Sequence, residues 1–366
     1  MDAKFLLRSR LFVAVGLGSV APASVLSCGG ETGTGHQGSG AGSAGEQGAG
    51  GTSGAAGTAG VGGSAAGASS GGAGGSVAGA GAGGAGFCEP WPACITIRRP
   101  FMVGTEMRSS DVAERADWLL SISPVAIPHA RTRAFLAASW LKDALEEHAS
   151  VAAFARFTML MLSFGAPPEL IIASQRASLD EVQHARACFA LARRYGSRDV
   201  GPSPLLVADS LSLTSLSELV ALTVAEGCVG ETLGALLAAE QLERADDPEV
   251  RKILRRIAKD EARHAELAWK FLAWALETGD AGVQTAARDA FRNASDEIER
   301  MRVVDYGVDV DLWHAHGRLT CAEARELSRV GVEQVVRPCF EALVGRIERM
   351  HDAGCPPDFA AMPGQA

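Results

Sequence analysis

The chain has 366 residues, of which 47% are hydrophobic and 6% aromatic, and its formal net charge is −9. This acidic balance argues against nucleic acid as a partner, because phosphate binding requires a basic surface. The eight cysteines include no Cys-x-x-Cys pair and so form no recognisable zinc pattern. Downstream of residue 28, we expect no run of residues long and apolar enough to span a membrane.

Residues 1–28 have the composition of an export signal. Basic residues up to Arg10 precede the apolar stretch Leu11–Ala21, which is too short for a spanning helix. The stretch leads to Val25-Leu-Ser-Cys-Gly29, which resembles a bacterial lipobox. That resemblance implies a lipid on Cys28, and hence a membrane anchor in the cell envelope, on the periplasmic side of the outer membrane or at the cell surface. The alternative is an ordinary cleaved signal with an incidental cysteine.

Two segments separate this signal from the helical part. Residues 29–86 are almost entirely Gly, Ala, Ser and Thr, which cannot form a core and predict a disordered, flexible tether. Residues 87–131 are expected to be irregular. Within them Cys88 and Cys94 could form a disulfide outside the cytoplasm or remain unrelated thiols. We also expect Ile95–Val103 to be extended and Asp111–Leu120 to be helical.

Apolar residues at helical spacing predict four long helices between residues 132 and 278. Proline at first turns and glycine behind last turns set their limits. The expected helices are Thr132–Ser163, Pro168–Tyr195 with Gly196 as C-cap, a third from the Ser215/Ser217 region to Arg244, and Pro248–Glu277. Polar residues of the fourth, Asp260 among them, are expected to face solvent. Residues 279–366 should add helices at 282–301 and 321–350 and a frayed tail. The predicted fold is all-α, a four-helix bundle with flanking helices.

Two of these helices carry the same pattern, Glu181-Val-Gln-His184 and Glu261-Ala-Arg-His264. Residues i and i+3 share a helix face, so each pair directs a carboxylate and an imidazole the same way. Each pair follows another helical glutamate, Glu147 or Glu226, at nearly the same distance. Four glutamates converging in an apolar interior need cations or protons, and two metal ions would satisfy them. The alternative is a metal-free bundle.

The apolar stripes decide which glutamates point inward. Glu147 interrupts an apolar stripe, whereas Glu146 lies on the neighbouring polar side of the helix. In the third helix Glu226 lies on the apolar stripe and Glu231 on a flanking row, so Glu231 is kept as an additional or alternate ligand. For the remaining candidates we favour structural roles over chemical ones. His148 is interpreted as a histidine on the polar side of its helix, and Cys188 and Cys228 as small core residues. His314 and His316 are interpreted as loop residues.

Four stretches resemble the ferritin-like superfamily of carboxylate-bridged di-iron bundles, in particular an uncharacterised bacterial group. They are Glu147-His-Ala-Ser-Val-Ala-Ala-Phe154, Asp180-Glu-Val-Gln-His-Ala185, Glu226-Gly-Cys-Val-Gly-Glu-Thr232 and Asp260-Glu-Ala-Arg-His-Ala265. The resemblance implies two iron ions, or manganese, with Glu181 and Glu261 as bridges. The implied ligands are Glu147, Glu181, His184, Glu226, Glu261 and His264.

The same resemblance implies an extracytoplasmic oxidoreductase that uses O2 or peroxide on iron or a small-molecule substrate. No rubredoxin-like Cys-x-x-Cys module is present, so electrons are expected from a separate donor. The tether and the additions at both ends argue against an iron-storage cage. The alternative is a non-catalytic metal-binding or structural envelope lipoprotein.

Overall fold

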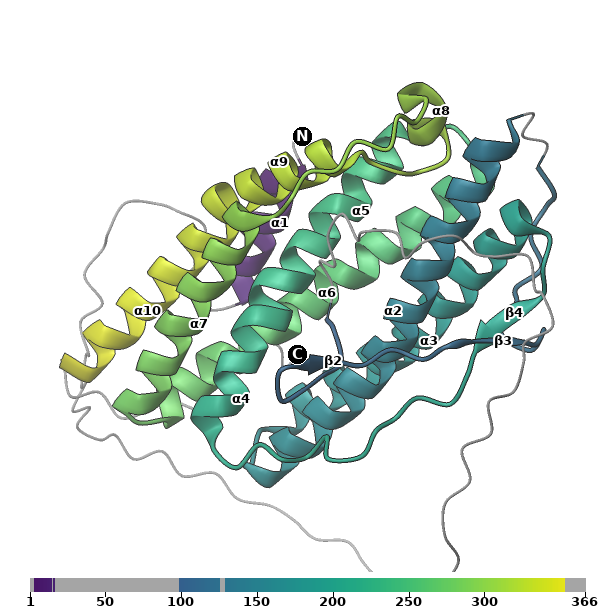
Figure 1. Cartoon of the computed structure of the whole chain (residues 1–366). Coiled ribbons are helices and arrows are strands. Elements are labelled where there is room, and N and C mark those ends of the chain that lie inside the picture. Colours follow the sequence, from purple (N-terminus) through teal and green to yellow (C-terminus); the bar gives the residue numbers. More distant parts are fainter. Residues whose placement is uncertain (1–2, 15, 17–98, 126–128, 353–366) are drawn as a thin grey trace, which may run out of the picture. The chain divides into compact units, whose positions relative to one another are not determined.

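The computed structural model describes residues 3–14, 16, 99–125 and 129–352. These residues are predominantly helical (Figure 1), so the all-α class is confirmed. Cys28, the tether at 29–86, Cys88 and Cys94 lie outside the described residues, as does the tail after residue 352. The helices are α1 (Ala3–Ala14), α2 (Ala130–Ser163), α3 (Pro168–Gly196), α4 (Leu216–Thr223), η1 (Val224–Glu231), α5 (Thr232–Arg244), α6 (Pro248–Thr278), α7 (Ala281–Arg300), α8 (Val310–Ala315), α9 (Cys321–Gly331), η2 (Val332–Val336) and α10 (Arg337–Asp352).

Helices α2 and α3 form the first packed pair, and both have nearly the predicted limits. The chain turns between them at Gly165, whose φ of 72° is readily adopted only by glycine. Pro168 begins α3, where its missing N–H costs no hydrogen bond. The end of α3 differs from the prediction, because Gly196 is still helical and Ser197 takes the left-handed conformation with φ 58°.

The predicted third helix is present but is not a uniform α-helix. A capping box between Ser215 and Glu218 begins α4. The middle of the segment, η1, is π-helical and contains Gly227 and Gly230, and α5 follows without a break. Wider i→i+5 turns change the direction of every later side chain compared with a continuous α-helix. Sequence periodicity alone does not reveal this change.

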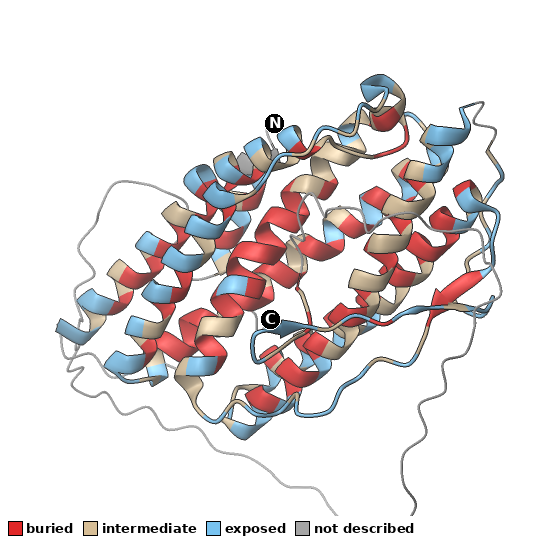
Figure 2. Ribbon diagram, in the orientation of Figure 1, coloured by how far each residue is buried: buried red, intermediate tan, exposed pale blue. Residues whose placement is uncertain are grey.

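Helix α6 completes the set of predicted long helices. Its N-cap is Asp247, whose side chain accepts hydrogen bonds from the backbone N–H groups of Glu249 and Val250. It packs against α3, η1 and α5, and its inner face is buried (Figure 2). Two apolar clusters line the interior of the helices. Each of the helices α2, α3 and α6 contributes one end to the first apolar cluster and the other end to the second. Several buried polar residues of these helices lie between the two ends, and so between two apolar regions.

The segment before α2 differs from the prediction. Asp111–Leu120 is not helical, because Val112–Glu114 (β3) pairs antiparallel with Val200–Pro202 (β4) from the connection between α3 and α4. Tertiary pairing has overridden local preference here. Nearer the N-terminus, Met102–Val103 (β1) pairs with Glu106–Met107 (β2), so the end of the stretch predicted to be extended is a strand.

The predicted C-terminal helices are also confirmed. The helix expected at 282–301 is α7, and the one expected at 321–350 is the continuous run α9–η2–α10. The region assigned to the export signal contains α1, which packs on α6, η2 and α10. Arg10 Nε donates to Glu266 Oε2 at 2.9 Å, and Leu11 is fully buried. Cleavage of this region stays a prediction.

Contrary to the expectation from the sequence, one helical run downstream of residue 28 has the length and composition of a membrane span. Leu216–Arg244, the run α4–η1–α5, is long and apolar enough by length and composition to cross a membrane. Most of its apolar window is buried against other parts of the chain. Core helices commonly combine this length and composition, and the buried face is why the run is so apolar.

Candidate metal centre

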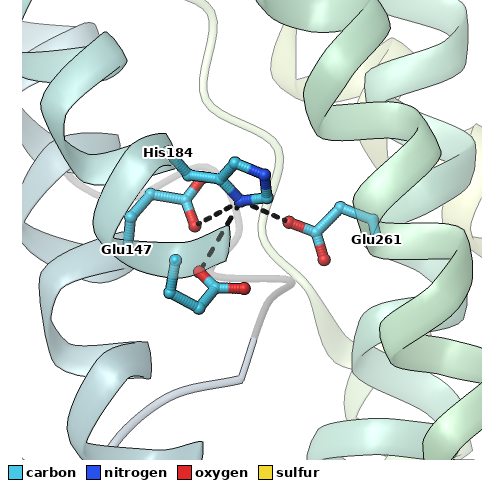
Figure 3. A group of neighbouring side chains, drawn as sticks. Glu147, His184 and Glu261 are labelled. Carbon is cyan, nitrogen blue, oxygen red and sulfur yellow. Dashed lines mark ion pairs between the residues drawn. The ribbon is translucent and has the colours of Figure 1, made fainter. Parts of the chain in front are cut away.

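Four buried side chains from three helices make the first ligand group. Glu147 comes from α2, Glu181 and His184 from α3, and Glu261 from α6. Each offers one ligand atom, and these atoms all lie within 4.8 Å of one another. His184 Nδ1 lies 3.8 Å from Glu147 Oε2 and 3.6 Å from Glu261 Oε1 (Figure 3). The group can therefore hold one metal ion.

A second group shares Glu261 with the first. It joins Glu231, the last residue of η1, to Glu261 and His264 of α6. His264 Nδ1 also approaches Glu181 Oε1 at 3.0 Å. The two imidazole centroids are 5.9 Å apart. The two groups therefore lie side by side and share one carboxylate.

Glu226 is the predicted ligand that the structure does not bring into either group. It is buried, and its carboxylate accepts from Arg156 Nη2 at 3.3 and 3.4 Å. Glu231 lies in the position that was expected for Glu226. A regular α-helical rotation would place Glu226 on the inner face, whereas the π-helical turns of η1 direct Glu231 toward α6.

Two aspartates orient the histidines, and sequence reasoning missed them. Asp260 Oδ2 lies 3.1 Å from His184 Nε2, and Asp180 Oδ2 lies 3.4 Å from His264 Nε2. Each histidine is therefore oriented from the opposite helix, leaving both Nδ1 atoms toward the carboxylates. Arg263 bridges the two aspartates, at 2.8 Å to Asp180 and 2.7 Å to Asp260. Asp260 was expected to face solvent but is buried. The repeated Asp-Glu-x-x-His could have revealed it.

The central groups have strongly shifted pKa values. Burial acts to raise the pKa of Glu181, but the imidazoles of His184 and His264 outweigh burial and lower it to about 2. Burial acts to lower the pKa of His184, but Asp260 and Glu181 outweigh it and raise the pKa to about 9. His264 is raised well above its ordinary pKa against the same effect of burial, by Asp180, Glu181 and Glu261. Without a metal, the imidazoles are therefore protonated counter-ions of the carboxylates.

Two carboxylates at the edge of the cluster have pKa values that are raised rather than lowered. Burial raises the pKa of Glu226 to about 7, although Arg156 and Arg99 oppose it. Burial and the charge of Glu261 raise the pKa of Glu231 well above its usual range, against Arg99. The second ligand group therefore contains a carboxylate that is harder to ionise than Glu181.

The donor set fits a metal ion on grounds independent of any relative. Among the described residues, Glu181 Oε2 and His184 Nδ1 are buried polar atoms that make no hydrogen bond. Buried polar groups in proteins are nearly always satisfied, so such atoms gathered in one place indicate a missing partner. Carboxylate oxygens with imidazole nitrogens suit ions such as Fe(II) and Mn(II).

The other residues considered from the sequence lie outside both ligand groups. Ser110 hydrogen-bonds His148 Nδ1 at 3.1 Å, so this ring is occupied by the segment before α2. His314 pairs with Glu323 at 2.9 Å and His316 with the hydroxyl of Tyr195 at 3.0 Å, so the two histidines have separate structural partners. Cys188 and Cys228 are fully buried in the apolar core. The structural interpretation of the histidines and cysteines is therefore favoured.

Comparison with known proteins adds no relative to this geometry. No family model, curated protein or solved structure matches the chain.

Proposed function

We propose that α2, α3, the run α4–η1–α5 and α6 act as a ferritin-like four-helix bundle that holds a dinuclear metal centre. The metal proposed is iron, with manganese as the alternative. The observation that carries the proposal is that Glu261 belongs to two ligand groups, one containing His184 and the other His264. A carboxylate shared in this way is what bridges two ions in a bundle core. The repeated Asp-Glu-x-x-His on α3 and α6 supports the same conclusion.

The reaction proposed is oxidation of iron or a small substrate by O2 or peroxide. Bound iron would supply the redox chemistry. The chain itself does three things around that site. Asp260 and Asp180 hold each histidine with Nδ1 toward the centre. The carboxylates supply negative charge that would favour the higher oxidation states of a bound metal ion. The surrounding apolar clusters limit the access of water.

The location proposed is the cell envelope, with the chain anchored through a lipid on Cys28. Support comes from the sequence around Cys28 and from the tether that follows it. Metabolic labelling with a clickable fatty acid in a bacterial host tests this directly. We expect label and membrane association in the wild type, and neither in Cys28→Ser. Equal labelling of the two proteins would exclude this anchor.

A non-catalytic metal-binding or structural role is the second candidate. It is favoured by the counter-ions built into the cluster: the raised pKa of His184 and the ion pair between Arg99 and Glu231 partly balance the carboxylates without metal. A bundle balanced in this way can persist as a scaffold. Metal content and reactivity separate the two roles.

The deciding experiment is anaerobic loading of the purified full chain with Fe(II), followed by metal analysis and exposure to O2 or peroxide. We expect two irons per chain, O2 consumption and a change in absorption. Glu181→Ala and His264→Ala should each bind less iron than the wild type while circular dichroism shows the helices intact. Folded protein without iron would support a purely structural role, and iron that does not react would support a non-catalytic metal-binding role.

A further inference from the structure

A buried arginine lies against the edge of the second ligand group. Arg99 precedes β1 and is only 2% exposed. Its Nε donates to Glu231 Oε1 at 3.2 Å. Its guanidinium lies over the rings of Phe154 and Phe157, 4.3 and 4.7 Å from their centroids. A permanent positive charge thus contacts one carboxylate of the cluster while it packs against two aromatic rings.

This contact makes the two ligand groups unequal. The first group has four members, and Glu231, the carboxylate that pairs with Arg99, is not among them. The second group has three members, and one of them is the partner of Arg99. A metal ion in the second position would have to compete with the guanidinium for Glu231 and would lie near a fixed charge of its own sign.

The surroundings of Arg99 restrict its withdrawal. Ser150 Oγ donates to the backbone oxygen of Arg99 at 2.7 Å, which ties this residue to α2. The guanidinium of Arg99 occupies the space that a side chain at position 227 would need. A Cβ built on Gly227 would lie 2.7 Å from Arg99 Nη2. The neighbouring carboxylate, Glu226, already pairs with Arg156. If Glu231 turned to a metal, Arg99 would become a buried cation without a carboxylate among the described residues.

We propose that Arg99 is a resident cation that makes metal loading stepwise. The position formed by Glu147, Glu181, His184 and Glu261 fills first. The position formed by Glu231, Glu261 and His264 fills only at higher metal concentration. This inference rests on the proposed function in one respect, that the cluster binds divalent metal. Because breaking a buried ion pair is costly, we expect the two affinities to differ by about tenfold or more.

Anaerobic titration of the metal-free full chain with Mn(II) tests the proposal, with free Mn(II) followed by electron paramagnetic resonance. The wild type should bind one equivalent tightly and a second about tenfold or more weakly. Arg99→Met and Arg99→Gln remove the charge and should tighten the second step about tenfold while leaving the first within about threefold. Arg99→Lys keeps the charge and should retain two separate steps.

Arg156→Met is the matched control, because it removes another buried arginine that pairs with Glu226 rather than Glu231. It should retain the two steps of the wild type. Two equally tight steps in the wild type would overturn the role of Arg99 and leave the dinuclear centre standing. The role of Arg99 would also be overturned if Arg99→Met or Arg99→Gln folds and still binds the second Mn(II) as weakly as the wild type. No Mn(II) or Fe(II) binding by any of the folded proteins would instead overturn the proposed function.

Discussion

Asp260 of α6 hydrogen-bonds His184 of α3, with 3.1 Å between Oδ2 and Nε2. The mirror pair, Asp180 of α3 and His264 of α6, repeats the contact at 3.4 Å. Each helix therefore supplies a carboxylate and an imidazole to the centre and also orients the imidazole of the other helix. This reciprocity explains why the same Asp-Glu-x-x-His pattern occurs on both helices, and it leads to the first prediction.

Asp260→Asn should weaken metal binding at the first position about 10- to 100-fold, because His184 loses the charged partner that fixes its orientation. Helical content should not change. The measurement is the Mn(II) affinity of the tightest step. Asp289→Asn, at a surface aspartate that pairs with Arg292, is the control and should bind like the wild type. An unchanged affinity in Asp260→Asn would mean that this hydrogen bond does not support a ligand.

Glu231→Gln and Glu226→Gln should separate the two candidate ligands of the third helix. The first variant removes a carboxylate of the second ligand group and should leave about one metal ion per chain. The second should keep the metal stoichiometry of the wild type, because Glu226 faces Arg156. Near pH 6 the second change should also cost little stability, since the pKa of Glu226 is about 7 and the carboxyl is mostly neutral there. The opposite pattern of metal content would make Glu226 the ligand.

The stability of the metal-free protein should depend on pH in a defined direction. His184 has a folded pKa of about 9 against 6.5 ordinarily, so its contribution is fully present below about pH 6.5 and is lost as the pH rises through 9. Glu181 has a folded pKa of about 2 against 4.5, so its contribution is present above about pH 4.5 and is lost as the pH falls toward 2. Urea denaturation should therefore give maximal stability between about pH 4.5 and 6.5.

Metal affinity should change with pH in the opposite sense over the alkaline range. A metal must displace the proton from His184 Nδ1, so affinity should rise as the pH increases from 6.5 toward about 9. Titrations at three or four pH values in that range measure the slope. A flat profile would show that His184 is already neutral in the metal-free protein.

Gly227→Ala should destabilise the fold by about 1–3 kcal/mol, because the added methyl group overpacks the core. Its Cβ would lie 2.5 Å from Ala268 Cβ and 2.7 Å from Arg99 Nη2. Gly345→Ala is the matched control, since its nearest neighbour is the flexible tip of Arg349 at 3.4 Å. That change should be neutral or stabilise α10 by about 0.5–1 kcal/mol. Equal urea midpoints for both variants would contradict close packing at Gly227.

The ligand pattern on α3 and α6 could be predicted because it depends only on local geometry. Glu181 with His184 and Glu261 with His264 are spaced one α-helical turn apart, and both helices are regular at those positions. Glu147 could be predicted for the same reason, since it interrupts an apolar stripe on a regular helix. Asp260 was misplaced because a charged residue beside basic neighbours suggests a solvated face, and its burial depends on His184 of another helix.

The sequence by itself determined the helical class, the long helices and most of the side chains of the candidate metal centre, because helical periodicity and residue type are local properties. Only the tertiary structure decided that Glu231 rather than Glu226 faces α6, since the π-helical turns of η1 leave no periodic signal. Only the tertiary structure brought Arg99, from a segment far from η1 in the chain, against Glu231. Contacts between distant segments depend on how the helices pack, and no local pattern encodes them.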